Sequence, residues 1–185
     1  MLVVGNARIG VATFFVISGY LITYLLRRES EQRGRISLRG FYYRRILRIF
    51  PAFYSYLIVI ALLAPLGVVT TGAYALLAAG TFTINYWTLM QHNPAATADG
   101  YWFVGHFWTL SLEEQFYLLW PLTLVLCGLY RARWVALTLI VVSPVIRLAT
   151  YYFWPAARDG IDVMLFTNFD ALMVGGAIAL IRGEP

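Results

Sequence analysis

The sequence predicts an all-α protein, a polytopic transmembrane helix bundle. Hydrophobic residues make up 61% of the 185 residues and aromatic residues 17%, more than a soluble domain of this length can bury. Only 12% of the residues are charged, and most of these charges lie between long apolar runs. A membrane-spanning helix needs about 20 largely apolar residues, and about six runs approach that length. We expect five or six of these runs to cross the bilayer.

The six apolar runs follow one another without a soluble domain between them. They are residues 9–26, 46–69, 73–90, 116–130, 134–150 and 161–181. Pro51 lies near the start of the second run, where a proline is best tolerated. The fourth run is short unless residues before Phe116 join it. In the first run, Ser18 and Gly19 form a small-residue notch that favours close packing of another helix.

The arginines predict the orientation of the first loop. All 14 basic residues are arginines, and eight of them fall within residues 27–48 against two glutamates. The positive-inside rule therefore places the loop 27–45 in the cytoplasm. The net charge of +5 gathers at this membrane-proximal loop, which indicates contact with membrane lipids and no nucleic-acid partner. The other arginines do not show on which side of the membrane residues 91–115 lie. The number of arginines on each side depends on whether the third run crosses the bilayer.

Three arginines at the start of the second run are candidate ligand-binding residues: Arg44, Arg45 and Arg48. Their spacing of three and four places them on one helix face, with Cβ atoms about 5–6 Å apart. Guanidinium groups bind phosphate oxygens in pairs of hydrogen bonds, so this face suits a phosphorylated ligand. A second interpretation stays open, because arginines at the cytoplasmic end of a span also fix topology and meet anionic lipid.

The segment 105–121, GHFWTLSLEEQFYLLWP, holds a histidine and two carboxylates at the edge of an apolar run. Ionisable groups in this position are costly and are functional candidates. On one straight helix His106 and Glu113 would share a face but lie about 10 Å apart, too far for a hydrogen bond. Either the segment bends, or each residue meets partners from other helices. For Glu114 we expect a helix-start role, with Ser111 as a possible N-cap.

Asp170 lies in the middle of the sixth run, where an unpaired carboxylate would be costly. Arg147 in the fifth run is the obvious partner, either in a structural ion pair or as part of a site.

Cys127 is the only cysteine, which excludes an intrachain disulfide and a two-cysteine metal motif. We expect no metal site.

Three segments in order, RIGVATFFVISGYLIT (8–23), GFYYRRILRIFPAFY (40–54) and residues 105–121, resemble the acyltransferase 3 family of integral-membrane O-acyltransferases. The resemblance covers the whole chain as one domain, residues 1–185. It implies transfer of an acyl group, often acetyl, from acyl-CoA to a hydroxyl of a cell-envelope glycan or lipid-linked acceptor. It also implies the bacterial inner membrane, with acyl-CoA as substrate and no tightly bound cofactor. It carries no indication of an oligomeric state.

The resemblance also assigns residues. The family's arginine-x-x-arginine pattern falls on Arg45 and Arg48 and implies a grip on acyl-CoA. Its tryptophan-[ST]-leucine-x-x-glutamate pattern begins at Trp108 and ends on Glu113 rather than Glu114. With His106 and Asp170, Glu113 completes the candidate catalytic set.

In the family, a helix with a catalytic histidine precedes the first motif, and further helices follow the motif at 170–172. Neither His92 nor His106 occupies that histidine's position. We therefore expect a chain truncated at both ends and inactive alone, unless His106 is itself the base. The alternative class is a non-catalytic transporter or assembly subunit, in which buried charges serve permeation or helix association. The lack of a visible internal repeat disfavours a transporter.

Overall fold

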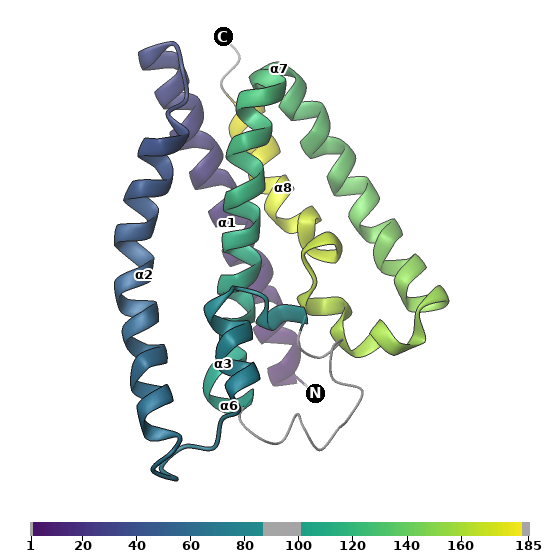
Figure 1. Ribbon diagram of the computed structural model, residues 1–185. Helices are drawn as coiled ribbons and strands as arrows, with labels where there is room; N and C mark the ends of the chain where they lie inside the picture. The colour runs from purple at the N-terminus through teal and green to yellow at the C-terminus, as the bar shows by residue number, and fades with distance from the viewer. Residues whose placement is uncertain (1, 87–100, 183–185) are drawn as a thin grey trace. The chain divides into compact units, whose positions relative to one another are not determined.

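The computed structural model describes residues 2–86 and 101–182, and every regular element in these ranges is a helix (Figure 1). Four helices there are long and apolar enough to cross a membrane. They are Ile9–Arg33, Leu38–Leu63, Trp102–Phe153 and Pro155–Ile181. The all-α transmembrane class is confirmed, and the chain is an integral membrane protein.

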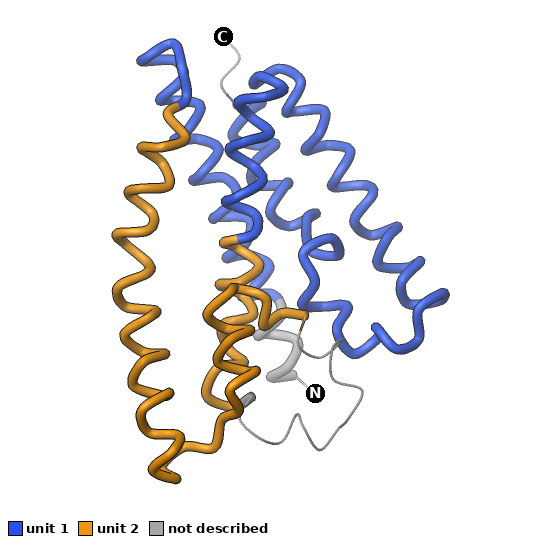
Figure 2. The backbone as a smooth tube through the Cα atoms, in the orientation of Figure 1, with its two compact units in different colours: residues 1–36, 115–185 blue, residues 37–114 orange. Residues whose placement is uncertain are grey.

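The chain divides into two compact units, which Figure 2 colours separately. Unit 1 combines residues 1–36 with 115–185, and unit 2 is residues 37–114.

The first two helices are longer than their apolar runs. Helix α1 spans Leu2–Arg33 and α2 spans Leu38–Leu63, so the expected loop 27–45 shrinks to a short connection at residues 34–37. Helix α2 begins early because the Ser37 hydroxyl accepts a hydrogen bond of 3.2 Å from the Gly40 amide. Pro51 consequently lies inside α2 and not near its start. The arginines of this region occupy helix ends rather than an extended loop.

The third run does not form a single spanning helix over its described part. Helix α3, Ala73–Gly80, has eight residues and is about 12 Å long, against a hydrocarbon core of about 30 Å. Phe82 adopts a positive φ of 55°, which breaks the helical path before the short 3₁₀ turn η1, Ile84–Tyr86. Residues 87–90 of the predicted run lie outside the described residues. The predicted run 73–90 therefore forms no continuous helix over its described part, residues 73–86.

The fourth and fifth runs belong to one long element, α7, Trp108–Phe153. Gly128 has φ 73° and ψ 161°, a conformation that suits glycine, and it divides α7 into two legs. Figure 1 shows α7 turning back on itself at this point. The first leg starts eight residues before the predicted run, so its early residues do join it. With α7 counted as two legs, the candidate membrane-spanning helices of the described chain come to five.

Unit 1 is held together by close contact between α1 and α8, Leu165–Ile181, which follows the 3₁₀ segment η3, Pro155–Val163. A Cβ atom on Gly19 would overlap the carbonyl group of Leu172, and one on Gly175 would overlap that of Val16. The predicted notch at Gly19 is thus a helix-packing contact. Ser18 hydrogen-bonds Tyr117 on α7 instead of its own helix backbone.

Unit 2 is built around the middle of α2. Its apolar core joins α2 to α3, η1 and the short helix α6, Tyr101–Val104. Phe53 is the central contact, because its ring packs 4.8 Å from those of both Phe82 and Phe107. Phe107 belongs to the 3₁₀ turn η2, Gly105–Phe107. This core therefore fixes η2, which carries His106, against α2.

Candidate functional site

Helix α2 and the segment from α6 to the start of α7 contact each other at three levels. At one end the Tyr56 hydroxyl donates a hydrogen bond of 2.8 Å to the Phe103 carbonyl. Phe53 and Phe107 pack in the middle. At the other end the Nε atom of Arg45 lies 3.1 Å from Oε1 of Glu114. The order of these contacts shows that the two segments run antiparallel.

Between these contacts lies a pocket of about 390 Å³. Its polar lining residues are Arg48, Tyr56 and His106, and its apolar ones are Ile49, Ala52, Phe53, Phe107 and Leu110. We call it the Arg48 pocket. It brings together Arg48 and His106, two of the residues that the sequence singled out separately.

Arg48 is the cation of this pocket. Its side chain is exposed, and within the described part of the chain it makes no hydrogen bond or ion pair. Arg45, one turn away, is 17% exposed and held by Glu114. Arg44 is exposed and does not line the pocket. Arg48 is thus the member of the cluster best placed to bind an anionic ligand in the pocket.

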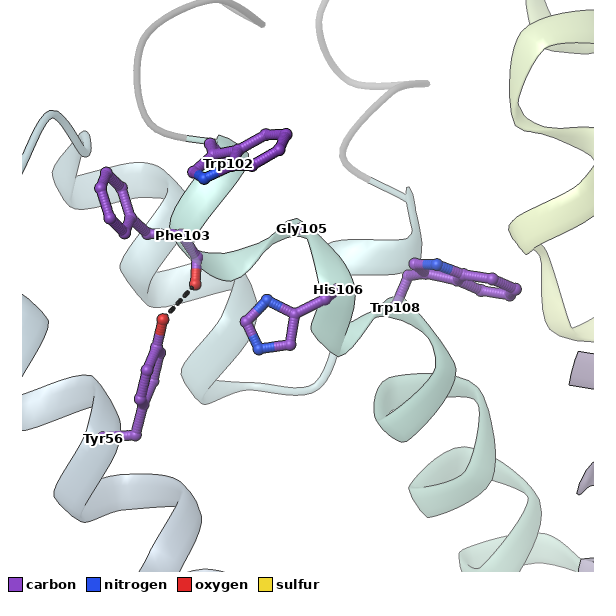
Figure 3. Close-up of a pocket in the computed structure, with 6 residues that line it drawn as sticks. All are labelled: Tyr56, Trp102, Phe103, Gly105, His106 and Trp108. Carbon is purple, nitrogen blue, oxygen red and sulfur yellow. Dashed lines mark hydrogen bonds between the residues drawn. The ribbon is translucent and has the colours of Figure 1, made fainter. Parts of the chain in front are cut away.

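His106 reaches the pocket because the chain bends. Helix α6 ends at Val104, η2 follows, and α7 begins only at Trp108. The imidazole stands edge-on to the Tyr56 ring, with ring centres 5.9 Å apart and an angle of 83°. Figure 3 shows it beside Tyr56, whose hydroxyl points to the Phe103 carbonyl. Of the two possibilities that the sequence left open, the bend is confirmed.

The two carboxylates have separate environments. Because α7 starts at Trp108, neither Glu113 nor Glu114 lies in its first turn, so the helix-start interpretation of Glu114 is wrong. Glu114 is instead the 15%-exposed partner of Arg45. Glu113 is buried, at 5% exposure, and is not among the residues lining the Arg48 pocket. Ser111 is no N-cap, because it lies inside α7 with its hydroxyl buried.

Asp170 belongs to unit 1, whereas the residues of the Arg48 pocket belong to unit 2. Nη2 of Arg147 lies 2.9 Å from its Oδ2 atom and 3.1 Å from Oδ1. The Nε atom of Arg147 also donates a hydrogen bond of 3.1 Å to the Thr167 carbonyl. The expected pairing of Arg147 with Asp170 is confirmed, and a catalytic role for Asp170 stays a prediction.

Sequence reasoning missed Tyr56 as a site residue. It lies eight positions after Arg48, two helical turns along the same face of α2, so helical periodicity could have pointed to it. Nothing in the sequence indicates that its hydroxyl meets the Phe103 carbonyl, because that contact joins residues 47 positions apart.

These features define a helical membrane domain with a pocket that is lined by both an exposed arginine and an imidazole. The family model described as "Acyltransferase domain", Acyl_transf_3, matches residues 1–181. The chain belongs to this family.

Among curated proteins, O-acetyltransferase OatA of Staphylococcus aureus strain NCTC 8325 is 35% identical over 139 residues, which cover 73% of this chain. A provisionally named O-acetyltransferase of S. aureus strain COL is 37% identical over 120 residues, or 63% of this chain. The matched segments cover 23% and 20% of those relatives, so the chain spans about a quarter of their length or less. No solved structure matches the chain.

Proposed function

We propose that this chain is the donor-binding part of a membrane O-acyltransferase that moves an acyl group, commonly acetyl, from acyl-CoA to a hydroxyl of a glycan or similar acceptor. Family membership and the O-acetyltransferase names of the relatives support the reaction class. The observation that carries the proposal is the shared lining of one pocket by Arg48 and His106. This pocket offers a cation for the donor phosphates and an imidazole for proton transfer.

The chemistry assigns each residue a task. The acceptor hydroxyl oxygen attacks the thioester carbonyl carbon, the carbon–sulfur bond breaks, and the CoA thiolate leaves with the proton that the hydroxyl loses. An imidazole within hydrogen-bond reach of that hydroxyl can accept this proton and pass it on. Arg48 holds the anionic end of the donor, which fixes the thioester relative to His106.

The arginine distribution supports access from the cytoplasm, where acyl-CoA is available. Arg48 lies ten residues along α2 from Leu38, about 15 Å at the helical rise. Leu38 begins the helix next to the short connection 34–37, and the positive-inside rule places the arginines of the flanking helix ends on the cytoplasmic side. We propose the bacterial inner membrane as the location, in line with the Staphylococcus relatives.

Equilibrium binding of radiolabelled acetyl-CoA to the chain in lipid nanodiscs tests the donor assignment. Arg48→Ala should weaken binding by about 1.5–3 kcal/mol, the usual contribution of a charge-assisted hydrogen bond. Arg39→Ala is the matched control, because Arg39 is also exposed on α2 but does not line the pocket. Equal affinities for both variants and the unmodified chain would overturn the assignment.

A further inference from the structure

A second hollow adjoins the first, on the side of α6. Its volume is about 550 Å³, and its lining residues are Tyr56, Trp102, Phe103, Gly105, His106 and Trp108 (Figure 3). We call it the aromatic pocket. Tyr56 and His106 line both hollows, so the aromatic pocket and the Arg48 pocket meet at these two side chains.

The aromatic pocket differs in chemistry from the Arg48 pocket. Its described lining contains no aliphatic side chain and no arginine. Apart from Phe103 and Gly105, its lining residues are rings that carry a polar N–H, nitrogen or hydroxyl at the edge. Such a lining matches a ligand with apolar ring faces and polar edges. A pyranose sugar has this form, since its C–H groups make an apolar face and its hydroxyls project from the rim.

Trp102 is a highly accessible ring of this lining. It is 87% exposed and lies on α6, immediately before the turn that carries His106. An exposed indole beside a hollow offers a stacking platform that requires little rearrangement of the protein. A sugar stacked there would bring its hydroxyls towards the imidazole that also lines the Arg48 pocket.

We propose that the aromatic pocket is the acceptor subsite, which binds a neutral pyranose ring of a glycan with Trp102 as its stacking platform. The inference deepens the proposed function, and its catalytic meaning rests on that function. Sugar binding itself depends only on the aromatic pocket. Because Tyr56 and His106 line both pockets, an acceptor hydroxyl in the aromatic pocket and a donor thioester in the Arg48 pocket would meet beside the same imidazole.

Saturation-transfer difference NMR on the chain in lipid nanodiscs tests the subsite directly. The probes are cellobiose and N,N′-diacetylchitobiose, whose β-linked rings expose flat C–H faces. Alkyl maltoside detergents must be absent because they carry a sugar headgroup of the proposed class. We expect saturable transfer to the ring C–H protons, reduced at least fivefold by Trp102→Ala and largely kept by Trp102→Tyr. Trp134→Ala is the control, since Trp134 is a half-exposed tryptophan of unit 1.

Three results would overturn the proposal. If the unmodified chain gave no saturation transfer to the disaccharide, a sugar site would be excluded. Equal transfer in the unmodified chain and Trp102→Ala would leave Trp102 as a membrane-interface anchor. Displacement of the disaccharide by hexanoate would assign the hollow to the donor's acyl chain.

The donor and acceptor assignments can fail separately. Arg48→Ala should leave the sugar signal unchanged, because Arg48 does not line the aromatic pocket. One result would refute the donor assignment and support the sugar subsite. In that result, Trp102→Ala weakens sugar binding but Arg48→Ala does not change acetyl-CoA binding. The reverse pattern would refute the sugar subsite alone.

Discussion

Arg45 and Glu114 form an ion pair that joins α2 to the start of α7, with Nε and Oε1 3.1 Å apart. Their side chains are 17% and 15% exposed, so both charges are largely removed from solvent. The pair occupies Arg45 and leaves Arg48, one turn further along α2, as the cation that lines the pocket with His106. Neighbouring arginines of one motif therefore have different environments and, we expect, different roles.

The first prediction concerns this ion pair. Removing one partner leaves a poorly solvated charge, so Arg45→Ala and Glu114→Gln should each lower the free energy of unfolding by about 1–3 kcal/mol. The double variant should lose less than the sum of the single losses, with a coupling energy of about 1 kcal/mol or more. Denaturant titration in mixed micelles measures all three. Strictly additive losses would show that the pair contributes nothing as a pair.

The second prediction concerns helix packing in unit 1. A methyl group at Gly19 meets the Leu172 backbone, so Gly19→Ala should destabilise the chain by about 1–3 kcal/mol through overpacking. Gly10→Ala in the same helix is the matched control, because a Cβ atom at Gly10 would have nothing within 4 Å. That control should leave stability unchanged or raise it by up to about 1 kcal/mol. Thermal unfolding, followed by circular dichroism, measures the melting temperatures of both variants. Equal melting temperatures would contradict the packing account.

The third prediction separates a positioning role from general stability. Tyr54→Phe and Tyr56→Phe each remove one hydroxyl bond to a backbone carbonyl, at 2.9 Å to Gly80 and 2.8 Å to Phe103. Each should cost about 0.5–1.5 kcal/mol of stability. Only Tyr56 lines the pockets, so only Tyr56→Phe should also slow acetyl transfer in the natural full-length protein.

The measurements for the tyrosine pair are the melting temperature and the turnover number of both variants. Similar melting temperatures with a lower turnover number for Tyr56→Phe alone would support the positioning role. Equal turnover numbers for the two variants would show that the Tyr56 hydroxyl makes only a structural contact.

The sequence predicted the helical membrane fold because burial in lipid requires long apolar runs, which composition reveals directly. It misplaced the start of α2, because the arginines before residue 46 resemble a loop until the Ser37 cap and the pairing of Arg45 are known. The third run had the composition of a spanning helix. It is interrupted at Phe82, whose ring packs on Phe53, a contact between residues 29 positions apart.

The sequence indicated individual candidate residues of the site. It did not indicate how these residues are arranged in space. His106 stood out because ionisable groups at the edge of an apolar run are costly, and Arg48 because its spacing places it with Arg44 and Arg45 on one helix face. Their common pocket depends on the bend at η2 and on the antiparallel contact of α2 with residues 103–114. Glu114 illustrates the limit of local reasoning. Its position near a helix start predicted a local role, whereas its partner lies 69 residues away.

The central claim is that an acyl-CoA bound through Arg48 presents its acyl group to position 106. A cysteine at that position can report this directly, in a background where Cys127→Ser removes the native thiol. In His106→Cys the thiolate attacks the CH₂ group of bromoacetyl-CoA, bromide leaves, and a thioether retains the CoA moiety. Mass spectrometry then measures the labelling rate. Tyr74→Cys is the control, because Tyr74 is exposed in the same unit and lines neither pocket.

We predict that labelling at position 106 is at least tenfold faster than at position 74. Acetyl-CoA should protect position 106, and adding Arg48→Ala should slow its labelling at least tenfold. Equal labelling rates at the two positions, or a rate at position 106 that does not depend on Arg48, would contradict the claim that these two residues form one donor site.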